Sequence, residues 1–151
     1  MSQVVIMRGI MGSGKSTWAK AQYPNAVICS ADDYHVNEAG LYDFKPENNG
    51  PAHAKSVSKY VDNLLAGTPV IVVDNTNISS WEIAPYYQLA LAFGCKVKIV
   101  RVHCSFEDAA KRGIHNVPVL QVWRAYQNLM TERLPPHWLE EFVFPTGENH
   151  V

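Results

Sequence analysis

The chain has 151 residues, of which 47% are apolar and 18% charged, and this balance fits one compact domain rather than a disordered chain. No run approaches the ~18–20 uninterrupted apolar residues of a membrane span, and no secretory leader precedes the polar, glycine-rich stretch that begins at Gly9. We therefore expect a cytoplasmic location and no membrane partner. The net charge of −1 lacks the basic excess of proteins that grip long duplex DNA.

The predicted elements alternate between strands and helices. In chain order they are a strand at 4–7, a helix at 16–22, a strand at 26–29, a loop at 36–51, a helix at 52–66, a strand at 69–73, a helix at 80–93, a strand at 96–102, a helix from Ser105 and a helix at 119–133. Gly67 and Gly94 are expected to terminate two of the helices. Such alternation predicts the α/β class, with a parallel sheet between helices.

The last part of the chain differs in composition. Residues 135–151 contain three glutamates and no lysine or arginine, together with Trp138, Phe142 and Phe144. We expect a domain at 1–134 followed by this acidic, aromatic tail, which either folds back on the domain or docks onto a partner. The other three tryptophans occupy apolar helical positions and are expected in the core: Trp18, Trp81 and Trp123.

One motif carries a definite chemistry. The segment from Gly9 to Ser16, GIMGSGKS, fits G-x₄-G-K-[ST] without a mismatch and lies between a predicted strand and a predicted helix. Its glycines let backbone N–H groups surround phosphates, and the helix adds its positive N-terminus. The fold is therefore expected to be a single P-loop NTPase-type domain with about four to five parallel strands. The residues expected to hold ATP are Gly9, Gly12, Ser13, Gly14, Lys15, Ser16 and Thr17.

Within this motif, Lys15 would contact the β- and γ-phosphates and the Ser16 hydroxyl would ligate Mg²⁺. Two acids follow neighbouring strands, where ligands of open α/β sheets bind. Asp32 is the predicted general base for a hydroxyl acceptor and a second candidate for the metal. Asp74 is expected on the metal side or in orienting the substrate. For Asp33 we favour a turn-capping role.

A basic segment at 111–118 joins the last two predicted helices. Arg112 is the candidate for a mobile arginine that closes over the phosphates and offsets charge during transfer. The alternative is a basic last turn that the helix dipole favours.

These motifs resemble a known group of P-loop kinases. The segment from Gly12 to Ala19, together with acids 32–33 and the DNTN sequence at 74–77, is similar to the kinase module of phage polynucleotide 5′-kinase. The loop at 42–46 and the segment at 112–118 are closer to the NEDD4-binding-protein-2-like branch. The resemblance covers residues 3–130. It implies ATP- and Mg²⁺-dependent phosphorylation of a 5′-hydroxyl on DNA or RNA.

The resemblance also indicates an acceptor site, for which the candidate residues are Tyr34, His35, Tyr42, Phe44, Asn75 and Asn77. Two positions depart from the phage pattern, because Ala31 and His35 stand where that kinase has arginines. A small-molecule kinase with a nucleoside, sugar or antibiotic acceptor is therefore the first alternative. A nucleotide-binding module without transfer activity is the second.

Overall fold

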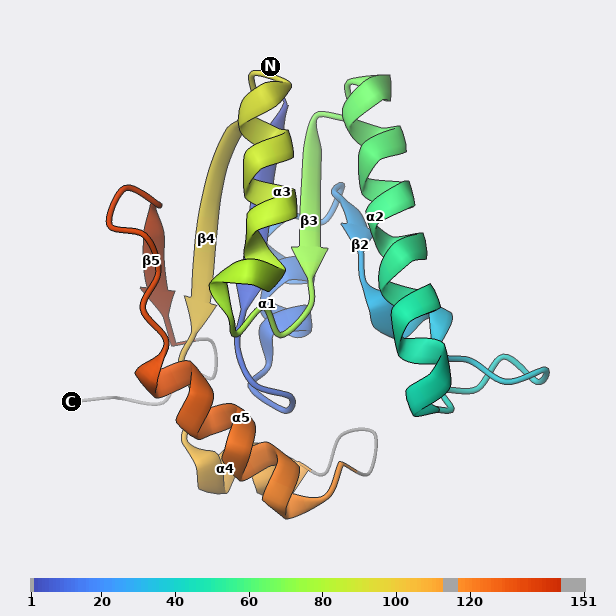
Figure 1. Cartoon of the computed structure of the whole chain (residues 1–151), viewed down its shortest axis with the longest axis vertical. Coiled ribbons are helices and arrows are strands. Elements are labelled where there is room, and N and C mark those ends of the chain that lie inside the picture. Colours follow the sequence, from blue (N-terminus) through green and yellow to red (C-terminus); the bar gives the residue numbers. More distant parts are fainter. Residues whose placement is uncertain (1, 113–116, 145–151) are drawn as a thin grey trace.

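The computed structural model describes residues 2–112 and 117–144, which form a parallel sheet with helices on both faces (Figure 1). The five strands run in the order β2-β3-β1-β4-β5. Their bounds are Gln3–Arg8 for β1, Val27–Cys29 for β2, Val70–Asp74 for β3, Lys96–Val102 for β4 and Glu140–Val143 for β5. The register pairs Met7 of β1 with Asp74 of β3, so the P-loop begins beside that carboxylate.

The helices follow the predicted order. They are α1 at Lys15–Gln22, α2 at Asn49–Ala66, α3 at Ser80–Ala92, α4 at Phe106–Arg112 and α5 at Val119–Thr131, with short 3-10 helices at Ala31–Tyr34 (η1) and Pro46–Asn48 (η2). Helices α4 and α5 lie beyond the carboxyl ends of the strands (Figure 1). No helix within the described ranges is both long and apolar enough to cross a membrane.

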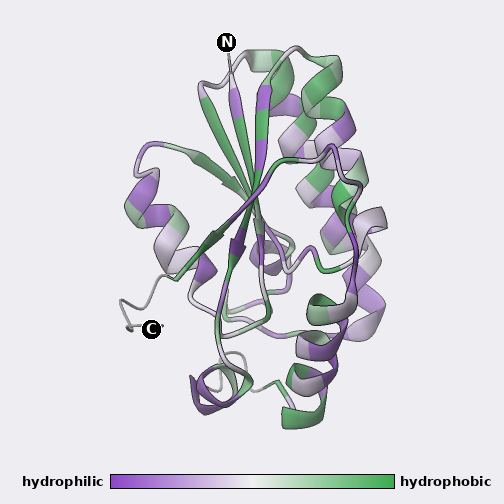
Figure 2. Ribbon diagram, turned by 90° about the vertical axis from the view of Figure 1, so that its left-hand side faces the viewer, coloured by the Kyte–Doolittle hydropathy of each residue, from purple (hydrophilic) through white to green (hydrophobic). Residues whose placement is uncertain are grey.

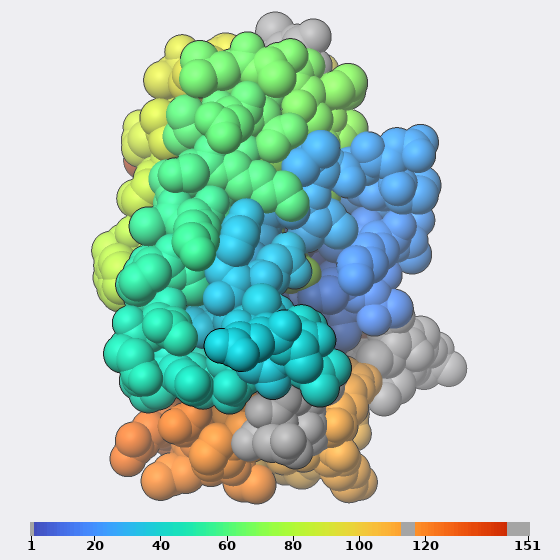
Figure 3. Space-filling view, turned by 90° about the vertical axis from the view of Figure 1, so that its right-hand side faces the viewer, coloured from blue at the N-terminus to red at the C-terminus, as the bar shows by residue number. Residues whose placement is uncertain are grey.

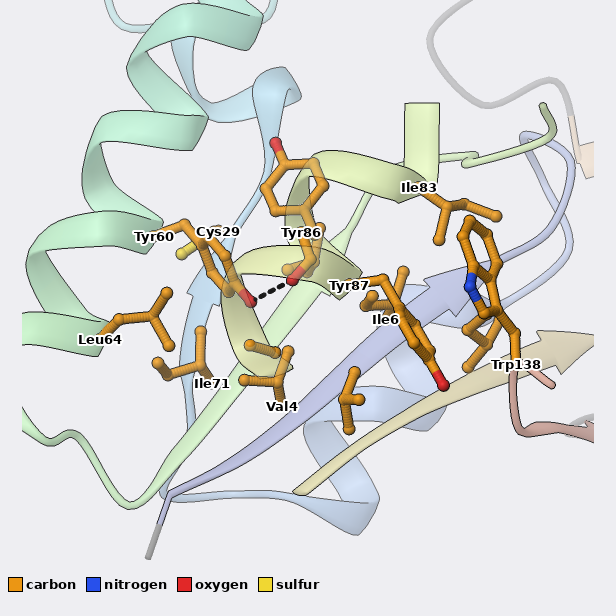
Figure 4. Packing of buried hydrophobic residues seen from close by; sticks show 14 residues of the cluster. Val4, Ile6, Cys29, Tyr60, Leu64, Ile71, Ile83, Tyr86, Tyr87 and Trp138 are labelled. Carbon is orange, nitrogen blue, oxygen red and sulfur yellow. Dashed lines mark hydrogen bonds between the residues drawn. The ribbon is translucent and has the colours of Figure 1, made fainter. Parts of the chain in front are cut away.

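The core has one layer on each face of the sheet, since the central strands are apolar on both faces (Figure 2). On one face, α2 and α3 cover the sheet, and the Tyr60 hydroxyl donates to the Tyr86 carbonyl at 2.7 Å (Figure 4). On the other face, α1 packs through Ala19, with Trp18 at its edge. The burial of Cys29 raises the pKa of its thiol to about 11, so this cysteine stays protonated at neutral pH.

The described part of the acidic segment, residues 135–144, folds back on the domain. Strand β5 pairs in parallel with β4, and the Trp138 ring stacks on Tyr87 with centroids 4.8 Å apart (Figure 4). Trp138 is buried in the same hydrophobic cluster as residues of β1 and α3. This strand was missed in the sequence because Glu140 and Glu141 interrupt its apolar pattern.

The exposure of two tryptophans corrects the sequence predictions. Trp81 is 75% exposed and Trp123 is 39% exposed, so the expectation of buried tryptophans was wrong for both. Trp123 instead packs against Phe106, with ring centroids 5.0 Å apart. The cap of α3 is Ser79, whose side chain and that of Glu82 form a capping box.

The end of β1 is fixed by a buried arginine. Arg8 is 1% exposed, and its guanidinium donates to the carbonyls of Asn77 at 3.0 Å and Ile78 at 2.6 Å and to the Glu140 carboxylate at 3.1 Å. Burial lowers the pKa of Arg8, whereas the charge of Glu140 raises it. Because Arg8 immediately precedes Gly9, these contacts anchor the start of the P-loop to the β3–α3 loop and to β5.

Replacing Arg8 with leucine is expected to destabilise the domain by about 3–5 kcal/mol, because it leaves Glu140 and two carbonyls without their donor. Urea unfolding measures this change. The matched control is Lys98→Met, which removes a more exposed ion pair with Glu141 (3.3 Å) and is expected to cost less than about 1 kcal/mol. Equal effects of the two substitutions would contradict the anchoring role of Arg8.

Candidate active site

The P-loop has the backbone that its glycines allow. Gly12 and Gly14 have φ angles of 81° and 90°, which L side chains rarely adopt. Gly14 caps α1, so the N-terminus of that helix faces the loop. The first residue of the motif is also held in place, since the Gly9 N–H donates to the Thr76 carbonyl at 3.0 Å.

The last two helices pack on the outside of this loop. Ile10 is 1% exposed and lies in a cluster with Ala109 of α4 and with Val122 and Leu129 of α5. A Cβ at Gly12 would lie 2.7 Å from the Ala109 carbonyl oxygen. Helix α4 therefore approaches the P-loop more closely than any side chain at Gly12 would permit.

Parallel pairing of β1 and β3 brings Ser16 of the P-loop motif close to Asp74 at the end of β3. The Ser16 hydroxyl donates to Asp74 Oδ2 at 2.5 Å. Asp74 is 7% exposed, and its other oxygen, Oδ1, is buried without a hydrogen-bond partner in the described structure. A buried carboxylate oxygen of this kind has the capacity to accept one further contact.

These residues fit a magnesium ion. Mg²⁺ is usually held by one or two protein oxygens, with waters and phosphate oxygens completing its coordination, and Ser16 and Asp74 supply two such oxygens. Burial is the main cause that raises the pKa of Asp33, the charge of Lys59 lowers it, and the nearby carboxylates of Asp32 and Asp74 raise it further. Three carboxylates therefore lie near one another at this edge, and a divalent cation would offset part of their charge. No group of three or more His, Cys, Asp or Glu within residues 2–112 and 117–144 suits a metal held by protein alone.

Asp32 lies at the end of the neighbouring strand β2, in η1. Its backbone N–H donates to the Ser30 hydroxyl at 3.3 Å, and the preceding Ala31 N–H donates to Asn75 Oδ1 at 2.9 Å. Two side chains therefore hold the backbone that carries Asp32. The carboxylate itself is at the wall of a cavity.

That cavity has a volume of about 890 Å³ and lies beyond the ends of β1 and β3, a usual place for ligands in such sheets. Its wall combines Lys15 and Asp32 with the aromatic rings of Tyr42 and Phe44. Figure 3 shows the hollow on this face, between the dark-blue residues of the P-loop and the lighter-blue residues that follow β2. The remaining lining residues are Met11, Ala31, His35, Asp43, Pro46, Asn49, His53, Asn75, Thr76, Glu82, Val117, Pro118 and Gln121.

Three sequence-predicted residues lie elsewhere. Tyr34 does not line the cavity. The Lys55 ammonium lies over the Tyr34 ring, with its nitrogen 5.9 Å from the ring centroid. Asn77 is 1% exposed, and its amide donates to the Met7 carbonyl at 2.8 Å, a contact that supports the fold. Arg112 donates to the Gly12 carbonyl and approaches Cys104 Sγ at 3.7 Å. It therefore touches the P-loop from the α4 side, and residues 113–116 that follow it lie outside the described ranges.

Two wall residues that the sequence analysis did not propose come from α2. Asn49 and His53 are one helical turn apart and both line the cavity. Asn49 Oδ1 lies 3.3 Å from Nε2 of His35, which is 2% exposed and packs 4.7 Å from the Phe44 ring. The i, i+4 spacing of Asn49 and His53 could have indicated that they share one face of a helix. The Asn- and Gly-rich start of α2 was instead interpreted as loop.

Comparison with known proteins identifies the family and the fold. A family model described as an AAA domain matches residues 4–115. The chain belongs to this family of P-loop kinase-type domains. The human protein NEDD4-binding protein 2 is 31% identical over an alignment of 133 residues, and the match covers 83% of this chain and 7% of that protein. The chain thus spans only a small part of its relative's length.

Solved structures share the fold at low sequence identity. A chain of the Pnkp1/Rnl/Hen1 RNA repair complex superimposes with a TM-score of 0.66 and 18% identity over 85% of this chain and 44% of that one. A gluconokinase from Sinorhizobium meliloti 1021 superimposes with a TM-score of 0.62 and 18% identity, over 95% of this chain and 82% of that one. The fold is therefore found both in an RNA repair assembly and in a sugar kinase.

The close contact at Gly12 makes a prediction. Gly12→Ala is expected to displace α4 and to weaken ATP binding by at least about tenfold, a cost of 1.4 kcal/mol or more. The matched control is Gly40→Ala, where φ is 78° but no atom lies within 4 Å of the added Cβ. This control should lose about 1–2 kcal/mol of stability through backbone strain alone and keep its ATP affinity in a fluorescence titration. Unchanged affinity in Gly12→Ala would contradict the packing of α4 on the loop.

Proposed function

We propose that this domain is an ATP- and Mg²⁺-dependent kinase that transfers the γ-phosphoryl group to a hydroxyl, most specifically the 5′-hydroxyl end of DNA or RNA. The observation that carries the proposal is the contact of Ser16 with Asp74 at the sheet edge where Lys15 and Asp32 face the cavity. Lys15 of the P-loop and the base candidate Asp32 line one cavity, and the metal-side pair consists of the residues next to two lining residues, Lys15 and Asn75. This arrangement suits phosphoryl transfer, which depends mainly on positioning and charge.

Each residue has a defined part in the reaction. Lys15 would bind the β- and γ-phosphates, and Ser16 with Asp74 would hold Mg²⁺, which would supply positive charge to offset that of the phosphates. The acceptor oxygen forms a bond to the γ-phosphorus as the bond to the β,γ-bridging oxygen breaks and ADP leaves. Asp32 accepts the proton of the attacking hydroxyl. Arg112 lies outside the cavity wall, against the Gly12 carbonyl, and it would have to leave this contact to offset charge on the transferring group.

Three observations support a polynucleotide end as acceptor. The cavity, at about 890 Å³, lies within the range of small-ligand sites and would take a terminal nucleoside. Tyr42 and Phe44 on its wall offer faces on which a base can stack, each worth ~1–3 kcal/mol. The similarity to a chain of an RNA repair complex favours the same substrate class.

The charge of the wall favours a second candidate, a small-molecule kinase. Lys15 is the only lysine or arginine among the described lining residues, whereas Asp32, Asp43 and Glu82 are acids. A polyanionic strand gains little from such a wall, and a neutral polyol such as a sugar suits it. A gluconokinase has the same fold over most of both chains, so this fold also serves a kinase with a small-molecule acceptor, although gluconate is itself an anion.

Label transfer from γ-labelled ATP with Mg²⁺ tests the proposal. The acceptors are 5′-hydroxyl DNA and RNA oligonucleotides, nucleosides and sugars. We expect label on oligonucleotide 5′ ends, and a loss of about 10²–10⁴ in kcat for Asp32→Asn, the usual scale for a general base. Asp33→Asn is the matched control, since Asp33 does not line the cavity, and should retain most of the wild-type rate.

The other outcomes discriminate among the alternatives. Label only on nucleosides or sugars would establish the small-molecule kinase. Tight ATP binding that Lys15→Ala weakens, with no transfer to any acceptor, would identify a nucleotide-binding module instead. A loss below tenfold in Asp32→Asn would remove Asp32 as the base.

A further inference from the structure

The residue after Asp74 connects β3 to its other neighbour in the sheet. Strand β3 lies between β2 and β1. On the β1 side, Asp74 accepts the hydrogen bond of Ser16 at 2.5 Å. On the β2 side, Asn75 Oδ1 accepts the Ala31 N–H at 2.9 Å. Two consecutive residues thus contact the N-terminus of α1, which follows the P-loop from β1, and the η1 turn, which follows β2.

The Asn75 contact is placed where it controls one catalytic candidate. Ala31 is 4% exposed and directly precedes Asp32. A buried backbone N–H that loses its acceptor pays a full desolvation penalty, so the peptide would shift to find another partner. The following N–H, that of Asp32, donates to Ser30 Oγ at the longer distance of 3.3 Å. The Asn75 oxygen is therefore the shorter of the two side-chain contacts that hold this backbone.

We propose that Asn75 is a positioning residue, whose side-chain oxygen fixes the peptide of Ala31 and so sets where Asp32 lies relative to the Ser16–Asp74 pair. This inference rests on the proposed function. It differs from the sequence-based expectation that Asn75 contacts the acceptor, although Asn75 does line the cavity. A general base must lie within about 2.6–3.2 Å of the proton it accepts, and a displacement of about 1 Å can cost about 100-fold in rate.

The kinetic test uses Asn75→Ala alone and together with Asp32→Asn. If Asn75 acts through Asp32, Asn75→Ala should lower kcat by about 10–100-fold and leave the acceptor KM within about threefold. In the Asp32→Asn background the same substitution should cause less than about twofold further loss, because residues that act as a unit are not additive.

A second readout does not depend on catalysis. Hydrogen exchange of the Ala31 amide, followed by NMR, should become about 5–100-fold faster in Asn75→Ala, since its acceptor is gone. Asn75→Asp keeps an oxygen at the same position and should keep this amide protected and exceed Asn75→Ala in kcat. The matched control is Asn63→Ala, which removes comparable contacts to Thr68 Oγ1 (2.7 Å) and Lys59 O (2.8 Å) far from the cavity. This control should change neither kcat nor the exchange rate of the Ala31 amide.

The outcomes separate this inference from the proposed function. A raised acceptor KM with kcat retained would mean that Asn75 contacts substrate, and a full further loss in the Asp32→Asn background would mean that it acts independently of Asp32. Unchanged exchange at Ala31 would overturn the inference whatever the activity. If the wild-type protein phosphorylates no hydroxyl acceptor, the proposed function fails and the inference fails with it, whereas each of the other results leaves the kinase assignment standing.

Discussion

The buried guanidinium of Arg8 connects the end of β1 to the β3–α3 loop and to β5, and the position of the P-loop depends on all three segments. It donates to two carbonyls of the β3–α3 loop and to Glu140 of β5. Asn77 of the same loop donates back to the Met7 carbonyl, and the Thr76 carbonyl accepts the Gly9 N–H. The start of the phosphate cradle is thus fixed by the loop that begins one residue after Asp74, and any shift of one would be transmitted to the other.

The candidate site follows from this constraint and from the strand order. Because β3 lies between β2 and β1, a single strand end serves both sides of the site: Asp74 contacts Ser16, and Asn75 contacts the backbone before Asp32. Phosphoryl transfer needs little covalent chemistry from the protein but accurate placement of donor, metal and base. The hydrogen bond from Ser16 of α1 to Asp74 and that from the Ala31 N–H of η1 to Asn75 provide such placement.

The sequence was sufficient for features that depend on local pattern. The strand at 96–102, the helix stop at Gly94 and the P-loop from Gly9 to Ser16 were predicted from periodicity and from a motif whose glycines have a specific backbone role, and the α/β fold was confirmed. What it could not provide depends on contacts between distant segments. Glu140 and Glu141 break the apolar pattern of β5, and the cavity wall from Asn49 and His53 exists only because α2 packs beside η1. Trp81 has the periodicity of a core residue but lies on the solvent side of α3.

The most direct test compares substitutions of Asp74 and Asp32, which should impair different properties of the protein. We predict that Asp74→Asn weakens Mg²⁺-dependent ATP binding, measured by calorimetry with and without Mg²⁺, because it replaces the carboxylate that contacts Ser16. Asp32→Asn should bind Mg²⁺-ATP as the wild-type protein does while losing transfer. Equal Mg²⁺-ATP affinity in wild type and Asp74→Asn, or a loss of affinity confined to Asp32→Asn, would contradict the assignment of the metal side to Ser16 and Asp74.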